Sequence, residues 1–183
     1  MIAPNRPIDL KRRFDSLFES HHVPVYRYCF RRLGRTDGED AAAEVFAIAW
    51  RRLDRVPVGE AARPWLLAVA YRVVSNRHRS RRRQGRLSLR LLSERPASPE
   101  PEILLDVEIE LLHRALDTLR EGDRELLRMS SWDGLSNSEI AAVIGIKENA
   151  IDQRLFRARA RLRDRLEILR NESTQINSWE AST

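Results

Sequence analysis

Apolar residues recur at the spacing of an α-helix along almost the whole chain, and no alternating pattern typical of a β-strand persists. The first helical stretch extends from Phe14 to Leu33, where Pro24 predicts a kink or a restart. A second stretch follows the turn "GRTDGED", with Asp37 as its expected N-cap. Its predicted buried side consists of Val45, Phe46, Ile48, Ala49, Trp50 and Leu53. The pattern predicts an all-α protein.

The third helical stretch, "WLLAVAYRVVSNRHRSRRRQ", begins as a core helix and ends as a cationic one. From Arg77 to Arg90 the chain carries seven arginines and no acid. Such a run is ordinarily a solvated helix face, but charges of one sign repel one another unless an anion compensates them. The whole chain has a formal net charge of +6, and only Lys11 and Lys147 among its 33 cationic residues are lysine. The charge suggests an anionic partner, most often nucleic acid.

The composition changes after this run. The segment "SERPASPEPEILLDVEIE" contains three prolines and six acids against one base, and its proline-rich part predicts an extended linker. The helical pattern then resumes and continues to about Arg170. We therefore expect two small helical domains joined by an acidic, proline-containing linker. The predicted divisions are an N-terminal extension (1–11), a first domain (12–92), the linker (93–104), a second domain (105–170) and a polar tail (171–183).

Within the second domain, "LSNSEIAAVIGIKENAIDQRLF" has the pattern of a helix-turn-helix. Ser136 and Glu139 form a predicted capping box, and Gly145 provides the turn. Lys147 occupies the position where the second helix of the motif would prefer a capping side chain. We therefore expect this helix to begin one or two residues later, with Asn149 as its cap. In such motifs the second helix enters the major groove of DNA.

The second helix of this motif has one apolar and one polar face. Ile151, Leu155 and Ala158 share the apolar face. The side chains predicted to contact DNA on the other face and its flanks are Asn149, Asp152, Gln153, Arg154, Phe156 and Arg157. Amide and guanidinium groups can contact base edges in pairs of hydrogen bonds, and phenylalanine can pack on a thymine methyl. The alternative is a solvent-exposed face of an ordinary helical hairpin.

Two segments together resemble the bacterial sigma-70 family, in its extracytoplasmic-function (ECF) group. The stretch from "LHRALDTLREGDRELL" to "RARARLRDRL" resembles region 4, and "DGEDAAAEVFAIAWRRLDRV…RPWLLAVAYRVVSNRHRSRRR" resembles region 2. The resemblance implies a transcription initiation factor with no catalytic activity and no cofactor. Region 4 would recognise the −35 element in duplex DNA and contact the polymerase flap region. Region 2 would bind the clamp coiled coil of core RNA polymerase and capture the melted −10 element.

The resemblance also assigns residues of the first domain. Core polymerase binding falls on Asp40, Glu44, Ala47 and Arg51. Capture of the −10 element falls on the loop from Arg55 to Arg63 and on Ser75, Asn76, Arg77 and Arg79. Departures from the family pattern are Ala43 in place of a frequent glutamine, Arg72 in place of a frequent asparagine, and Asp152 in place of a common basic residue. An acid at position 152 would favour a cytosine amino group.

Other interpretations compete with this one. A stand-alone helix-turn-helix regulator would explain the second domain but leave the first without a role. A metal-dependent nuclease would use acids and histidines such as His21, Asp40 and Glu44, but no standard ligand spacing is present and no metal is expected.

The sequence shows no membrane or targeting segment. Since the N-terminal residues lack the apolar stretch of a signal peptide and no apolar run approaches membrane length, we expect no membrane insertion and a cytoplasmic protein. Because ECF sigma factors are commonly held by anti-sigma proteins, such a factor is a further candidate partner.

Overall fold

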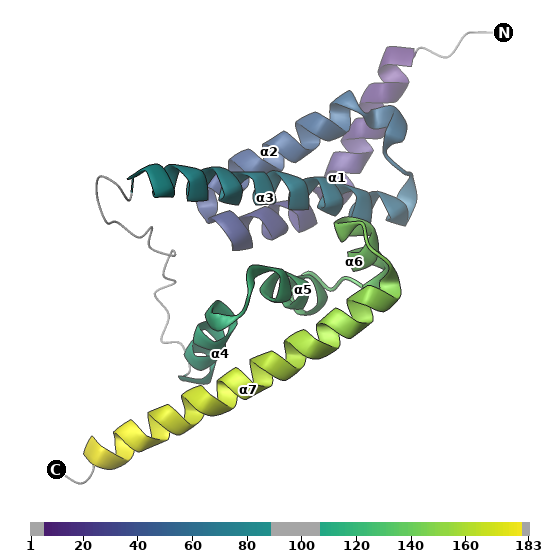
Figure 1. Cartoon of the computed structure of the whole chain (residues 1–183). Coiled ribbons are helices and arrows are strands. Elements are labelled where there is room, and N and C mark those ends of the chain that lie inside the picture. Colours follow the sequence, from purple (N-terminus) through teal and green to yellow (C-terminus); the bar gives the residue numbers. More distant parts are fainter. Residues whose placement is uncertain (1–5, 89–106, 181–183) are drawn as a thin grey trace. The chain divides into compact units, whose positions relative to one another are not determined.

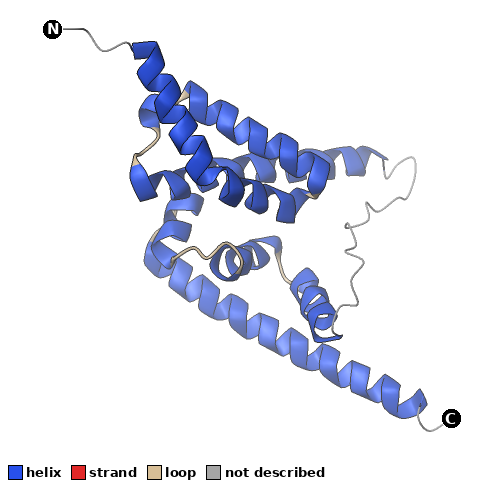
Figure 2. Cartoon of the chain, turned by 180° about the vertical axis from the view of Figure 1, so that it is seen from behind, coloured by secondary structure: helices blue, strands red, loops and turns tan. Residues whose placement is uncertain are grey.

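The computed structural model describes residues 6–88 and 107–180 (Figure 1). The predicted acidic linker, residues 93–104, lies outside this range. Within the described ranges all regular structure is helical, as the periodicity predicts (Figure 2). The chain divides into two compact units near residue 100.

The N-terminal unit is built from three long helices, each of which packs against the other two. They are α1 (Arg6–Leu33), α2 (Arg35–Arg51) and α3 (Ala62–Ser88), and two short 3₁₀ helices, η1 (Leu53–Arg55) and η2 (Gly59–Ala61), lie between α2 and α3. The core contains fully buried side chains from all three helices, among them Val25, Tyr28, Val45, Leu66 and Leu67. Cys29 is buried among them.

A glycine allows the first two helices to approach closely. A Cβ atom added to Gly38 on α2 would lie 2.8 Å from the Cα atom of Phe30 on α1. No side chain fits at that distance without a shift of the backbone. Gly38 therefore determines how closely α1 and α2 pack.

Three expectations for this unit were wrong in detail. Helix α1 begins at Arg6 rather than Phe14 and passes through Pro24 without interruption; Pro7 is tolerated because the first turn needs no backbone donor. Helix α2 begins after Gly34 with no side-chain cap, and Asp37 lies in its first turn instead.

The third of these expectations concerns Trp50, which is 48% exposed although the periodicity places it on the buried side of α2. Its ring packs edge-on against Phe14, with the centroids 5.0 Å apart, and this contact covers part of the ring.

The C-terminal unit consists of α4 (Val107–Thr118), α5 (Glu121–Ser131), α6 (Asn137–Ile144) and α7 (Glu148–Glu180), with α4 and α5 packed against α7. Its core contains Leu111, Ala115, Leu126, Met129, Ile151 and Leu155. Helix α7 continues to Glu180, so much of the expected polar tail 171–183 is helical. The segment from Asn171 to Glu180 contains no proline or glycine that would end the helix.

Candidate nucleic-acid interface

Both ends of α6 have the predicted geometry. Glu139 donates its backbone N–H to the Ser136 hydroxyl at 3.2 Å, and its carboxylate accepts the Ser136 backbone N–H at 2.8 Å. Gly145 adopts a left-handed conformation with φ of 83°, and the backbone N–H groups of Gly145 and Ile146 both bond to the Ala141 carbonyl. The predicted capping box and glycine turn are confirmed: the capping box fixes the start of α6, and the glycine turn sets the direction in which α7 leaves it.

The predicted Asn149 cap is wrong. Helix α7 begins at Glu148, and the Lys147 carbonyl accepts from the backbone N–H groups of Ala150 and Ile151. Asn149 therefore lies inside the first turn with its side chain exposed. The helix therefore begins with Lys147, which is not a preferred capping residue, at its N-cap position.

Helix α7 presents two chemically different faces over its first three turns. Ile151, Leu155 and Ala158 are almost completely buried. The exposed face carries all six side chains predicted to contact DNA, namely Asn149, Asp152, Gln153, Arg154, Phe156 and Arg157. Phe156 is 74% exposed, more than any other phenylalanine, tryptophan or tyrosine in the described part of the chain. This face can therefore present amide, guanidinium and aromatic groups to a base edge together.

Several polar side chains of α7 already contact other residues of the same unit. Asn137 on α6 donates its side-chain amide to Asp152 at 2.5 Å. Arg161 pairs with Asp123 on α5 at 2.5 Å, and Arg159 donates to Ser130 at 3.3 Å. The sequence pattern could not reveal the Asn137 contact, because the two residues lie 15 positions apart on different helices.

The candidate polymerase-binding residues share an exposed face of α2. Asp40, Glu44, Ala47 and Arg51 are all exposed, and Arg51 donates to the Ala47 carbonyl at 3.2 Å. Trp50, which the sequence interpretation placed in the core, is exposed next to them. Helical spacing does not decide its side, because Trp50 lies three residues after the exposed Ala47 but four residues after the buried Phe46.

Ion pairs connect this face of α2 to the cationic helix α3. Arg77 pairs with the Glu44 carboxylate at 3.1 Å and donates to the Asp37 carbonyl at 3.2 Å. Arg81, one turn further along α3, pairs with the Asp37 carboxylate. The predicted polymerase-binding and −10-binding residues are thus in direct contact through Glu44 and Arg77.

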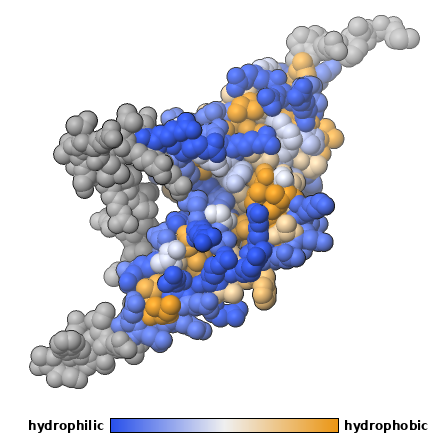
Figure 3. Space-filling view, in the orientation of Figure 1, coloured by the Kyte–Doolittle hydropathy of each residue, from blue (hydrophilic) through white to orange (hydrophobic). Residues whose placement is uncertain are grey.

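The remaining candidate −10 residues are distributed over the loop and α3. Arg55, Asn76 and Arg79 are exposed, whereas Arg63 and Ser75 are partly buried. The surface over the later turns of α3 is strongly hydrophilic (Figure 3). A row of cations beside an amide is suited to a nucleic-acid strand, whose phosphates the arginines can neutralise.

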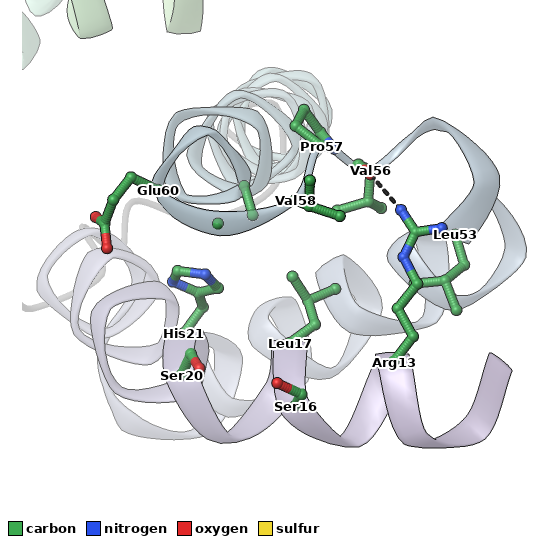
Figure 4. A pocket seen from close by; sticks show the side chains of 12 residues that line it. Arg13, Ser16, Leu17, Ser20, His21, Leu53, Val56, Pro57, Val58 and Glu60 are labelled. Carbon is green, nitrogen blue, oxygen red and sulfur yellow. Dashed lines mark hydrogen bonds between the residues drawn. The ribbon is translucent and has the colours of Figure 1, made fainter. Parts of the chain in front are cut away.

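A cavity of about 310 Å³ lies between α1 and the segment that joins α2 to α3 (Figure 4). Arg13 on α1 donates to the Val56 carbonyl across it at 2.6 Å. At its other end His21 and Glu60 face each other (Figure 4). Burial lowers the pKa of His21; the Glu60 carboxylate opposes this shift and Arg63 adds to it. Arg13 was not among the residues predicted to have a role, and His21 was considered only as a nuclease ligand, although both lie on one helical face with Leu17.

Two further findings concern the competing interpretations. Within residues 6–88 and 107–180, no group of three histidine, cysteine, aspartate or glutamate side chains is arranged to hold a metal ion. Over the same part of the chain, no helix is both long and apolar enough to cross a membrane.

Known proteins resemble both units. Residues 17–84 match the family model described as Sigma-70 region 2, and residues 109–162 match Sigma-70, region 4. RNA polymerase sigma factor CnrH of Cupriavidus metallidurans is 30% identical over 165 residues, which cover 83% of this chain and 85% of CnrH. ECF RNA polymerase sigma factor SigL of Mycobacterium tuberculosis is 29% identical over 84% of this chain and 89% of SigL.

Solved structures show the same fold. CnrH, in complex with the cytosolic domain of CnrY, is similar with a TM-score of 0.57 and 26% identity over 86% of this chain and 90% of CnrH. Sigma factor RpoE from Bartonella quintana, in complex with the anti-sigma factor NepR, has a TM-score of 0.61 and 22% identity over 91% of this chain and 99% of RpoE.

Proposed function

Because this chain belongs to the sigma-70 family, in its extracytoplasmic-function group, and is a promoter-directing sigma factor, we propose which of its surfaces performs each step of initiation. The exposed face of α7 recognises the −35 element in duplex DNA. The α2 face formed by Asp40, Glu44, Ala47 and Arg51 binds core RNA polymerase. The segment from Arg55 to Arg63 and the polar side of α3 capture the melted −10 element.

The observation that carries this proposal is the exposed polar face of α7 directly after the capping box and glycine turn. Asn149, Gln153 and Arg157 lie on this face, and they can form hydrogen bonds to base edges. Phe156 supplies an apolar group between them, 74% exposed in the free protein. A face that only served solubility would not need a large exposed ring among such side chains.

The proposed −10 site uses different chemistry, as melted DNA requires. Unpaired bases need polar groups for their edges, and their backbone needs cations. Asn76 offers both a donor and an acceptor, and the exposed Arg55 and Arg79 supply charge, while the charge of Arg77 is partly balanced by Glu44. The ion pair between Glu44 and Arg77 supports this arrangement, because it joins a residue of the proposed −10 site to one of the proposed polymerase-binding face.

The proposed partners follow from this division of work. We expect the α2 face to bind the clamp coiled coil of core polymerase and the C-terminal unit to contact the flap region. An anti-sigma factor is a further proposed partner, by analogy with RpoE from Bartonella quintana, which was solved with the anti-sigma factor NepR. The protein would act in the cytoplasm by binding and would catalyse no reaction of its own.

The test is reconstitution with core RNA polymerase that has been stripped of its own sigma factor. The protein should co-elute with the polymerase at moderate salt, and genomic DNA should then give discrete transcript starts. Aligning the DNA upstream of these starts should give two dissimilar elements. If the protein shifted DNA but did not bind polymerase, and its sites were two-fold symmetric, it would be a stand-alone regulator and the proposal would fail.

A further inference from the structure

The segment between α2 and α3, which carries Arg55, has little regular structure of its own. Its two 3₁₀ helices are one turn each, and such short helices are weakly stabilised by their own hydrogen bonds. Between them lie Pro57, which has no backbone N–H group, and Val58, which is 78% exposed. The conformation of this segment must therefore depend on contacts with other elements.

Helix α3 contacts η2, and one face of α1 lines a cavity together with the segment. Arg13, Leu17 and His21 recur every four residues and line the same cavity as the segment (Figure 4). Leu17 is buried there, as are Leu53 and Val56 of the segment. Burial of these apolar side chains favours the position of the segment beside α1, but because the hydrophobic effect is non-directional, it does not orient the backbone of the segment.

A charged hydrogen bond adds the orientation. Arg13 donates its Nη2 to the carbonyl of Val56 at 2.6 Å, in a partly buried position. Hydrogen bonds from a charged donor are shorter and about twice as strong as neutral ones. Val56 is the residue at which η1 ends and the backbone becomes extended, with φ of −72° and ψ of 123°. The bond therefore acts at the point where the chain changes direction.

We propose that Arg13 is a positioning residue for −10 capture: by holding the Val56 carbonyl, it sets the course of residues 56–61 and the placement of Arg55 beside them. This inference rests on the proposed role of this segment. Arg13 acts through the segment and does not contact DNA. Without the bond, the segment keeps its buried apolar side chains but loses the orientation in which its residues meet the melted strand.

The test compares holoenzymes that differ at this position. Arg13→Met keeps the apolar stem of the side chain but removes its donors, and Arg13→Lys restores a charged donor. Arg12→Met is the matched control, because Arg12 is an exposed arginine on the same helix. Promoter opening is followed by permanganate reactivity, and selectivity by the ratio of transcripts from promoters with intact and substituted −10 elements.

We expect Arg13→Met to lower promoter opening about tenfold, the equivalent of one charged hydrogen bond, and to reduce the −10 selectivity ratio. Polymerase affinity and duplex −35 binding should stay unchanged, and Arg13→Lys should recover part of both losses. Arg12→Met should behave as wild type. A general loss of stability would not change the selectivity ratio of the folded holoenzyme. Hydrogen–deuterium exchange should also rise in residues 54–61 of Arg13→Met and not in α7.

Two results would overturn the inference: opening and selectivity equal to wild type in Arg13→Met, or equal losses in Arg12→Met. If Arg13→Met did not fold, Arg13→Gln would be measured in the same way, with the same results deciding. Failure of the wild-type holoenzyme to open any promoter would instead refute the proposed function itself. The two failures are therefore distinguishable.

Discussion

The side chains of Asn137 and Asp152 join the two helices of the helix-turn-helix through a hydrogen bond of 2.5 Å. Asn137 is the first residue of α6, and Asp152 lies in the second turn of α7, on the face proposed to contact DNA. One carboxylate oxygen of Asp152 accepts this bond, which leaves the other able to accept from a base. The same residue can thus fix the packing of α7 and contribute to base preference.

Substitution of the two partners should separate these roles. Asp152→Ala should relax discrimination at one −35 base pair by about 1–3 kcal/mol, because a carboxylate can accept from a cytosine amino group. Asn137→Ala should lower stability by about 0.5–1.5 kcal/mol through the lost hydrogen bond without changing the order of preferred bases. Binding to a panel of −35 duplexes and thermal unfolding measure the two effects. Equal changes in base preference would show that Asp152 acts through helix packing alone.

Arg157→Ala should weaken −35 recognition in a base-dependent manner. Arg157 is exposed on α7 and donates its Nε to the Gln153 carbonyl at 3.2 Å, so its terminal nitrogens extend from the helix with one end held. We expect a loss of about 1–3 kcal/mol on the preferred element. Arg163→Ala, an exposed arginine further along the same helix, is the control. A uniform loss on every duplex would identify Arg157 as a phosphate contact.

Glu44→Arg should abolish polymerase binding, since it reverses a charge on the proposed α2 face and places it beside Arg77. Glu39→Arg, an equal change at another exposed position of α2, should bind core polymerase normally.

Arg77→Ala breaks the ion pair between Arg77 and Glu44 but leaves Glu44 in place. It should therefore keep polymerase affinity and lose −10 capture. Co-elution with core polymerase measures the first effect and permanganate reactivity the second; loss of polymerase binding in Arg77→Ala would contradict the assignment.

Gly38→Ala should destabilise the N-terminal unit. The added Cβ would lie 2.8 Å from the Phe30 Cα and force α1 and α2 apart. Overpacking of this kind costs about 1–3 kcal/mol. The control is Gly122→Ala in α5, where no atom lies within 4 Å of the added Cβ and helix propensity favours alanine by about 1 kcal/mol. Denaturant unfolding measures both; equal stability of Gly38→Ala and wild type would mean that the helices can separate without cost.

Local chemistry determined much of the C-terminal unit from sequence alone. The capping box of Ser136 and Glu139 and the turn at Gly145 involve residues within a few positions of one another, so their geometry depends on the residue types and spacing. The buried and exposed faces of α7 follow in the same way from a period of 3.6 residues. These features were predictable because neighbours in the chain decide them.

Contacts between helices were decided by the tertiary structure. The exposure of Trp50 depends on how much of its ring Phe14 covers, and the bond from Arg13 to Val56 joins residues 43 positions apart. The pairs Asn137–Asp152 and Glu44–Arg77 are likewise invisible in a one-dimensional pattern. Periodicity shows which side of a helix is buried, whereas the partner of each side chain depends on the angle and distance at which the helices pack.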